Sequence, residues 1–190
     1  MSNGYLVFIP DVVFRKGEPG ASSYDAVVSG VKSLIDRYDF IDKDRIALNG
    51  HSWGGYQIAF LVTRTNMFKA AVSGAPVVNM TSAYGGIRWE SGKSRMFQYE
   101  QTQSRIGGTL WDKPAEFIRN SPLFFLPQVQ TPVLIMHNDK DGSVMWEQGI
   151  EFFMALRRLD KPVWLFNYKG EGHHLKKWEN RLDYSRRVME

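Results

Sequence analysis

The chain has 190 residues, a net charge of +4 and no cysteine, and 43% of its residues are hydrophobic. This length suits one buried core and is short for two, so we expect a single domain over residues 1–190. Interspersed charges argue against a nucleic-acid partner. A membrane partner is not expected, because no apolar run approaches the roughly 20 residues of a membrane-spanning helix. The absence of cysteine excludes disulfides and thiolate chemistry.

The first part of the chain predicts alternating strands and helices. Residues 5–9 form a short apolar run that ends at a proline, which predicts a strand buried on both faces. A helix is expected over about 22–37, because apolar residues recur there at helical spacing and its start resembles a capping box. Residues 45–49 predict another buried strand, and residues 56–62 predict a helix.

The rest of the chain continues this alternation after one irregular stretch. Residues 77–130 carry many aromatic residues and several glycines, and we expect short helices and loops that cover the edge of the sheet. The later elements are strands expected at 68–73, 132–137 and 163–168, and helices expected at 144–159 and 175–190. This order predicts a parallel α/β sheet with helices on both faces.

Residues 50–54 read Gly-His-Ser-Trp-Gly. They match Gly-x-Ser-x-Gly, the tight turn that exposes a serine nucleophile between a strand and a helix in α/β-hydrolases. Small residues two positions either side of Ser52 let the strand and the helix approach closely. The pattern alone is weakly specific, but its place between the predicted strand 45–49 and the predicted helix 56–62 is the arrangement it requires. We therefore predict Ser52 as a nucleophile.

A serine nucleophile needs a base within hydrogen-bond reach and a carboxylate that orients the base. The chain has four histidines, at positions 51, 137, 173 and 174. His51 is adjacent to Ser52 and is expected to point away from it, and His137 has no suitable carboxylate between it and the serine. The order serine, acid, histidine leaves the pair after the last strand. We favour His173, which directly follows a glycine in a tight loop, over His174.

The acid is expected after the strand at 132–137. Asp139 and Asp141 both lie there, and spacing alone does not choose between them. A single aspartate in a turn is more often a turn former, and a histidine pair in a glycine loop is more often an ordinary polar loop. We nevertheless favour a catalytic role for these residues. The loops that carry the serine, the aspartates and the histidine pair are all predicted at the carboxyl ends of strands, where open α/β sheets bind ligands.

Four separated motifs resemble the catalytic domain of the prolyl oligopeptidase family of serine peptidases, which includes dipeptidyl- and acylaminoacyl-peptidases. They are Gly-His-Ser-Trp-Gly-Gly-Tyr at 50–56, Ser-Gly-Ala-Pro-Val at 73–77, Pro-Val-Leu-Ile-Met-His at 132–137 and Gly-Glu-Gly-His at 170–173. The resemblance covers nearly the whole chain. It implies an α/β-hydrolase fold and a serine peptidase that hydrolyses short peptides through an acyl-enzyme. We expect neither a cofactor nor a metal site.

The family's pattern His-Gly-x-x-Asp-x-x-Val corresponds to residues 137–144 and implies that Asp141 is the acid. Asn138 stands where the family usually has glycine, which puts the shape of this turn in question without moving the aspartate. By the same matching, Ser52 is implied to be the nucleophile and His173 the base.

The resemblance also implies how substrate is held. The backbone N–H of Trp53, the residue after the nucleophile, is implied to be one oxyanion donor. The side chains of Trp53, Val77 and Met80 match positions that wall the family's pocket for the residue before the scissile bond. Because these side chains are apolar, we expect cleavage after an uncharged residue.

Parts of the family's catalytic domain have no counterpart in this sequence. These parts are earlier strands, one of which lies between the strands that match 5–9 and 45–49, and a loop that supplies the second oxyanion donor. The N-terminal β-propeller that the family also carries has no counterpart either. We therefore expect a fragment of a larger peptidase or a clipped gene model, with slow turnover and with unpaired strand edges that invite self-association. Any targeting signal would lie on the missing part, so the compartment stays open.

Two alternative functions stay open. One is a carboxylesterase with the same triad, and the other is a non-catalytic hydrolase-like module that lacks the oxyanion loop. The sequence does not distinguish an exopeptidase from an endopeptidase.

Overall fold

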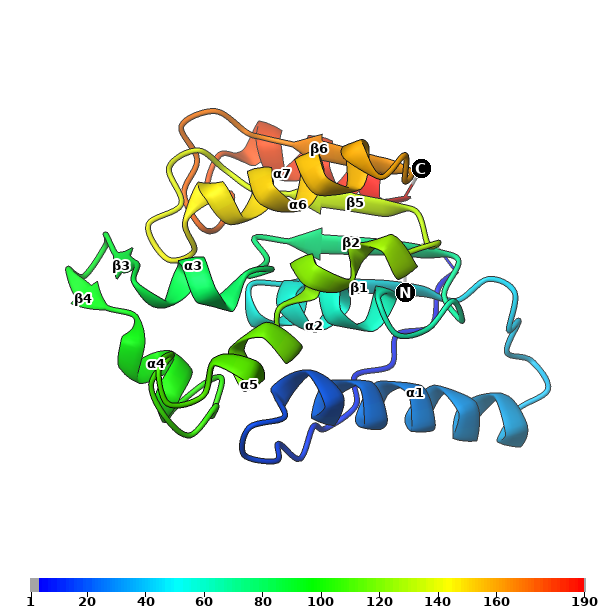
Figure 1. The fold of residues 1–190 in the computed structure, drawn as a ribbon. Helices are drawn as coiled ribbons and strands as arrows, with labels where there is room; N and C mark the ends of the chain where they lie inside the picture. Colours follow the sequence, from blue (N-terminus) through cyan, green and yellow to red (C-terminus); the bar gives the residue numbers. More distant parts are fainter. Residues whose placement is uncertain (1–3, 190) are drawn as a thin grey trace.

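The computed structural model describes residues 4–189. Its main sheet has four parallel strands in the order β1-β2-β5-β6 (Figure 1). These strands are β1 (Ala47–His51), β2 (Ala70–Gly74), β5 (Val133–Met136) and β6 (Val163–Phe166). A separate antiparallel hairpin consists of β3 (Ile87–Arg88) and β4 (Lys93–Ser94).

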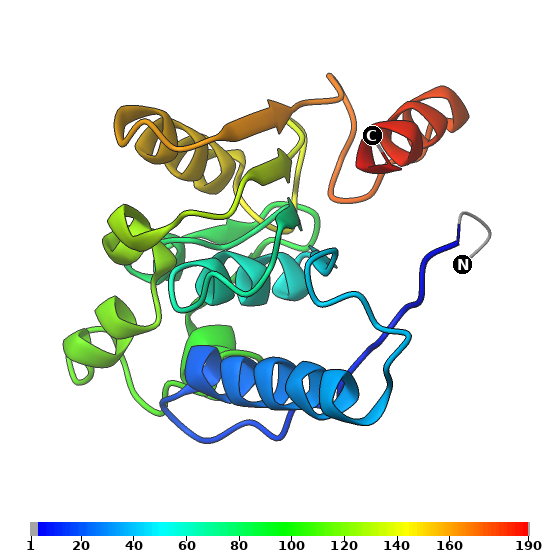
Figure 2. The ribbon, with the colours of Figure 1, turned by 90° about the vertical axis from the view of Figure 1, so that its right-hand side faces the viewer.

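Helices cover both faces of the main sheet. The longer ones are α1 (Pro19–Arg37), α2 (Trp53–Val62), α6 (Trp146–Arg158) and α7 (Trp178–Met189). Figure 2 shows α2 and α6 on one face and α7 on the other. The predicted parallel α/β architecture is therefore confirmed. No helix within residues 4–189 combines the length and the apolar character that a membrane crossing requires.

The stretch between β2 and β5 holds short elements, as the sequence predicted. They are α3 (Met80–Tyr84), the β3–β4 hairpin, α4 (Met96–Glu100), α5 (Pro114–Arg119) and the 3-10 helix η1 (Pro122–Gln128). Figure 1 places α3 and the hairpin beyond the carboxyl ends of the strands of the main sheet. This position lets the excursion contact the loops that leave those strands.

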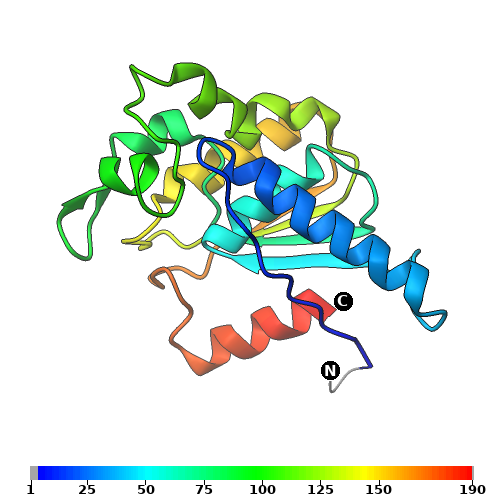
Figure 3. The same cartoon turned by 90° about the horizontal axis from the view of Figure 1, so that it is seen from below.

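Helix α1 begins at Pro19, earlier than the capping-box spacing predicted. Proline suits the first helical turn because its φ is already helical and it needs no partner for an N–H group. The Oγ of Ser22 donates to the carbonyl oxygen of Glu18 at 2.7 Å, so this serine lies inside the first turn instead of capping the helix. Helix α1 then packs on α2, as the view from below shows (Figure 3).

Residues 5–9 do not form the predicted strand. They have no regular secondary structure, and Leu6, Val7 and Ile9 expose 72%, 65% and 85% of their surface. An apolar run becomes a strand only where a neighbouring strand pairs with its backbone groups. Among the described residues β1 pairs with β2 alone, so its outer edge does not meet this segment. Self-association along that edge stays a prediction.

Two clusters of buried apolar side chains meet at α2. The first lies between the sheet and helices α1, α2 and α6, and it includes Ile58 of α2. The second lies under the excursion between β2 and β5, and it includes Tyr56 and Phe60 of α2. Helix α2 is apolar around most of its circumference because both sides are buried. Full burial of each large apolar side chain contributes about 1.5–3 kcal/mol, so this helix anchors both cores.

Gly55 and Gly54 make a matched test of how closely α2 packs on the sheet. A Cβ at Gly55 would lie 2.2 Å from the carbonyl oxygen of Gly74, whereas a Cβ at Gly54 would have no heavy atom within 4 Å. We predict that Gly55→Ala lowers the free energy of unfolding by about 1–3 kcal/mol, because helix and strand must separate. Gly54→Ala should raise it slightly, by less than about 1 kcal/mol, because alanine favours the helix.

Urea unfolding of both variants, followed by circular dichroism, measures this difference. Equal stabilities for the two alanine variants would contradict the close approach of helix and strand.

Candidate active site

The turn between β1 and α2 carries Ser52. Its φ is 60° and its ψ is −118°, a conformation that costs a non-glycine residue about 1–3 kcal/mol. The N–H of Ser52 donates to the carbonyl oxygen of Gly74 at 2.7 Å, and the carbonyl oxygen of Ser52 accepts from the N–H of Tyr56 at 3.0 Å. Strand β2 and the first turn of α2 therefore hold the strained turn in place.

The glycines around the turn have different roles. A Cβ at Gly50 would lie 2.7 Å from the carbonyl oxygen of Gly54 and 2.8 Å from Cδ1 of Ile58, so this position has no room for a side chain. Gly54 has open space where its own Cβ would be. The second tight position is Gly55, whose carbonyl oxygen also accepts a hydrogen bond from Oγ of Ser73 at 2.9 Å.

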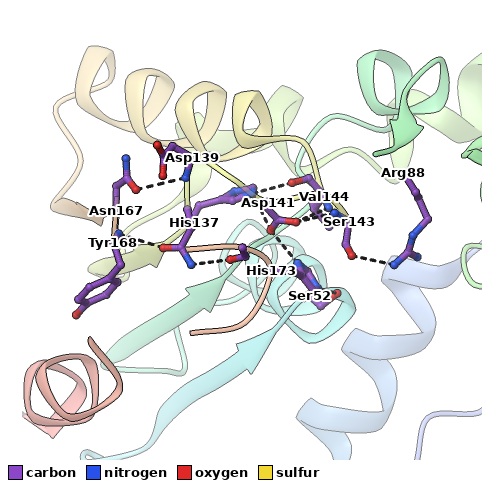
Figure 4. A network of polar contacts seen from close by, with 12 residues as sticks. Ser52, Arg88, His137, Asp139, Asp141, Ser143, Val144, Asn167, Tyr168 and His173 are labelled. Carbon is purple, nitrogen blue, oxygen red and sulfur yellow. Dashed lines mark hydrogen bonds and ion pairs between the residues drawn. The ribbon is translucent and has the colours of Figure 1, made fainter. Parts of the chain in front are cut away.

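His173 lies between Ser52 and Asp141 (Figure 4). The Oγ of Ser52 is 2.8 Å from Nε2 of His173, and Nδ1 of His173 is 2.7 Å from Oδ2 of Asp141. The three side chains come from the ends of β1, β5 and β6, which meet at one edge of a parallel sheet. Asp139, the other candidate acid, instead accepts a hydrogen bond from the N–H of Gly170 at 2.7 Å.

The environment of Asp141 keeps its carboxylate charged. The side chain is fully buried, and its Oδ1 accepts hydrogen bonds from the N–H groups of Ser143 and Val144, both at 2.8 Å. Burial raises the pKa of Asp141, but hydrogen bonds from His137, His173 and the N–H of Val144 outweigh burial and hold this pKa well below its ordinary value. An ionised Asp141 retains the Nδ1–H of His173, which leaves Nε2 free to accept a proton.

His137 lies behind the acid and is completely buried. Its Nε2 is 3.1 Å from the carbonyl oxygen of Val144 and 3.4 Å from Oδ2 of Asp141. A Cβ at Gly149 would lie 2.6 Å from its Nδ1, so helix α6 presses directly on the ring. His137 therefore supports the acid loop from inside the protein.

His51 lies beside the base and its neighbour His174. Its ring centroid lies 4.8 Å from the ring centroids of both His173 and His174, because the loop after β6 returns over the end of β1. Burial, and then the neighbouring His173 and His174, lower the pKa of His51 to about 4. Its Nε2 is buried and has no hydrogen-bond partner among the residues that the structure describes.

A sequence model of the prolyl oligopeptidase family, peptidase S9, matches residues 14–190. The chain belongs to the prolyl oligopeptidase family. The uncharacterized peptidase YuxL of Bacillus subtilis is 31% identical over 164 residues, which cover 84% of this chain and 23% of that protein. The human acylamino-acid-releasing enzyme is 29% identical over 174 residues, covering 88% of this chain and 22% of that enzyme. The chain thus spans less than a quarter of the length of these relatives.

Solved structures share the fold. A putative dipeptidyl aminopeptidase IV from Bacteroides ovatus superimposes with a TM-score of 0.76 at 22% identity, over 93% of this chain and 22% of that one. A puromycin-hydrolyzing peptidase from Mycobacterium tuberculosis superimposes with a TM-score of 0.75 at 24% identity, over 89% of this chain and 24% of that one. The predicted α/β-hydrolase fold of this serine peptidase family is confirmed.

Asn138, the departure from the family's usual glycine, joins the acid loop to the base loop. It is buried, its Nδ2 donates to the carbonyl oxygen of Gly172 at 2.8 Å, and its Oδ1 accepts from the N–H of Tyr168 at 3.1 Å. Its φ is not positive, so the backbone does not require glycine here. The sequence offered no signal for this role, because both partners lie at least 30 residues further along the chain.

Glu171 is a second supporting residue that the sequence analysis missed. Its buried carboxylate accepts hydrogen bonds from the N–H of Lys176 at 2.8 Å, the N–H of Lys177 at 3.0 Å and Nδ2 of Asn180 at 2.6 Å. These contacts tie the base loop to the start of α7. A glutamate shortly before a helix is a weak signal by itself, and only the fold brings this one under the loop of His173.

The β3–β4 hairpin supports the acid loop from the other side. The Oγ of Ser143 accepts from Nη2 of Arg88 at 3.0 Å (Figure 4). It also donates to Oε2 of Glu90 at 3.1 Å. The guanidinium of Arg95, just after β4, donates to the carbonyl oxygen of Ser143. The excursion between β2 and β5 therefore helps to position the backbone next to Asp141.

The predicted pocket residues lie at the second core cluster. Val77 and Met80 expose 4% and 0% of their surface, and Trp53 packs against this cluster with its ring stacked on Tyr56 at 4.4 Å. A cleft of about 560 Å³ nearby is lined by other residues, namely Phe14, Lys16, Glu100, Gln101, Arg105, Gly107 and Gly108. An apolar substrate pocket at Trp53, Val77 and Met80 stays a prediction.

The strained backbone of Ser52 makes a prediction about stability. Both Ser52→Gly and Ser52→Ala remove the hydroxyl, but glycine adopts a φ of 60° without steric cost. Relief of about 1–3 kcal/mol of strain should exceed the glycine penalty of about 0.4–1 kcal/mol in the unfolded chain. We predict that Ser52→Gly is more stable than Ser52→Ala by about 1 kcal/mol in urea unfolding. The opposite order would show that this turn stores no strain.

Proposed function

We propose that this chain carries the catalytic machinery of a serine peptidase that cleaves short peptides. Ser52 is the nucleophile, His173 the base and Asp141 the orienting acid. The observation that carries the proposal is the continuous row of contacts from Oγ of Ser52 to Nε2 of His173 at 2.8 Å and from Nδ1 of His173 to Oδ2 of Asp141 at 2.7 Å. Membership of a serine peptidase family supports the reaction class, and acylamino-acid-releasing and dipeptidyl-peptidase relatives support short peptides as substrates.

The proposed reaction has two halves. Nε2 of His173 accepts the hydroxyl proton while Oγ of Ser52 attacks the carbonyl carbon of the peptide bond. His173 then gives this proton to the leaving amine, and the acyl group stays on Ser52. A water molecule that loses a proton to His173 attacks the acyl-enzyme and releases the second product. Asp141 stays ionised in both halves and stabilises the protonated imidazole ring.

Each attack leaves a negative charge on the former carbonyl oxygen, and hydrogen-bond donors must stabilise this charge. Trp53 is the first residue of α2, and N–H groups in a first helical turn have no acceptor inside the helix. The helix dipole adds positive potential at the same place. We therefore assign one oxyanion donor to the N–H of Trp53.

The residue before the scissile bond is proposed to enter at the side chain of Trp53. Displacement of this ring would expose the apolar cluster that contains Val77 and Met80. An unpaired charge is costly in such surroundings, so the preferred residue is uncharged.

Hydrolysis of aminoacyl p-nitroanilides by the purified chain tests the function. We predict that substrates with leucine or phenylalanine are cleaved more than about tenfold faster than those with lysine or glutamate, because an apolar pocket rejects an unpaired charge. A fluorophosphonate probe should label the chain, and Ser52→Ala should abolish both hydrolysis and labelling. Cleavage of p-nitrophenyl acetate without any anilide hydrolysis would favour the carboxylesterase. A chain that the probe does not label would favour the non-catalytic module.

The two aspartates of one loop give a matched test of the acid. We predict that Asp141→Asn lowers kcat/KM for the best anilide by about 10³- to 10⁴-fold, because the amide no longer holds the base in the productive tautomer. Asp139→Asn should change it by less than about threefold, because Asp139 contacts the N–H of Gly170 and not the base. Circular dichroism confirms that each variant is folded. Similar losses in both variants would refute the assignment of Asp141.

A further inference from the structure

Three histidines gather beside the nucleophile. His51 comes from the end of β1, and His173 and His174 come from the loop after β6. One ring nitrogen from each residue lies within 4.8 Å of the other two, and all three pairs of ring centroids are 4.8 Å apart. His51 meets the other two only in the folded chain, because more than 120 positions separate its neighbour Ser52 from His173.

The cluster is open to solvent at His174, and Asp141 supports it at His173. His174 is exposed, His51 is partly buried, and His173 exposes 9% of its surface. Nδ1 of His173 is held by the carboxylate of Asp141 at 2.7 Å, so Nε2, which lies 2.8 Å from Oγ of Ser52, is the nitrogen of this ring that can bind an ion. Nε2 of His51 is buried without a hydrogen-bond partner within residues 4–189. Such a nitrogen is costly unless it finds a partner.

We propose that His51, His173 and His174 bind one divalent transition-metal ion of the Zn²⁺ type. Three imidazole nitrogens with an open fourth position form a known zinc donor set. Imidazole selects zinc, copper, nickel and cobalt over magnesium and calcium, which prefer oxygen ligands. Since the nitrogens lie within 4.8 Å of one another, each has to move inward by about 1 Å at most to reach the usual zinc–nitrogen distance of about 2.0–2.1 Å. The exposed side chain of His174 has room to move.

Asp141 makes His173 a better metal ligand. A carboxylate that accepts the second N–H of a metal-bound histidine fixes the ring and makes its other nitrogen a better ligand. The 2.7 Å contact between Asp141 and Nδ1 of His173 provides this arrangement. The buried negative charge also attracts a cation to the cluster.

The ion and the nucleophile compete for one nitrogen. Oγ of Ser52 lies 2.8 Å from Nε2 of His173, and an ion on this nitrogen removes the acceptor for the hydroxyl proton. Metal binding is therefore a reversible block of catalysis. This consequence rests on the proposed function, whereas the binding itself does not.

Calorimetric titration of the metal-free chain with ZnCl₂ tests the site without any assay of activity. We expect one ion per chain, no heat of binding with MgCl₂, and visible absorption bands of low-coordinate cobalt when CoCl₂ replaces zinc. His174→Ala and His51→Ala should each weaken zinc binding by more than about tenfold, because even outer-shell losses cost a metal site 10- to 100-fold. Glu179→Gln removes an exposed carboxylate close to His174 in the sequence and should bind zinc as the parent does.

Two further measurements distinguish a failure of the metal site from a failure of the proposed function. Ser52→Ala, which is catalytically inert under the proposed function, should still bind zinc, because the hydroxyl is not a ligand. In the parent chain, zinc should block fluorophosphonate labelling and EDTA should restore it. Zinc binding by a chain that hydrolyses nothing would keep the metal site and refute the proposed function. No zinc binding, or binding that His174→Ala does not weaken, overturns the metal site.

Discussion

The carbonyl oxygen of Gly74 is the point at which strand β2, the serine turn and helix α2 meet. It accepts the N–H of Ser52 at 2.7 Å, and it would lie 2.2 Å from any Cβ at Gly55. The hydrogen bond holds a backbone of positive φ that an isolated chain would leave, and the missing side chain lets the helix come close enough to form it. The buried cores on both sides of α2 supply the stability that keeps this turn strained.

The acid and base loops depend on the same sheet but are adjusted to one another by polar contacts. Asn138 links the two loops through Tyr168 and Gly172, and the β3–β4 hairpin contacts the acid loop through Ser143. A buried carboxylate such as that of Asp141 is stable only when its oxygens are hydrogen-bonded. The N–H groups of Ser143 and Val144 and the ring of His173 are its partners. The contacts of Asn138 and of the hairpin hold the loops that carry these groups.

The histidine cluster follows from the same arrangement. The loop that brings His173 to Ser52 also carries His174, and it lies over His51 at the end of β1, so that the three ring centroids are 4.8 Å apart. From the sequence we expect no metal site, and His51 lies far along the chain from the other two histidines. The imidazole of His173 faces two further imidazoles, and under the proposed metal site its Nε2 binds either a proton or a metal ion.

The sequence by itself determined the parallel α/β class, the four strands of the main sheet to within about two residues, and the turn at Ser52, because periodicity and glycine placement act over a few neighbouring residues. The same local logic was wrong for residues 5–9, whose apolar run has no strand to pair with. Spacing also left Asp139 and Asp141 equivalent until a resemblance distinguished them. Only the tertiary structure decided what Asn138 holds and which rings His51 contacts, and it shows Asp141 at His173. These outcomes depend on contacts between residues that the chain separates by 30 or more positions, and no local pattern encodes such contacts.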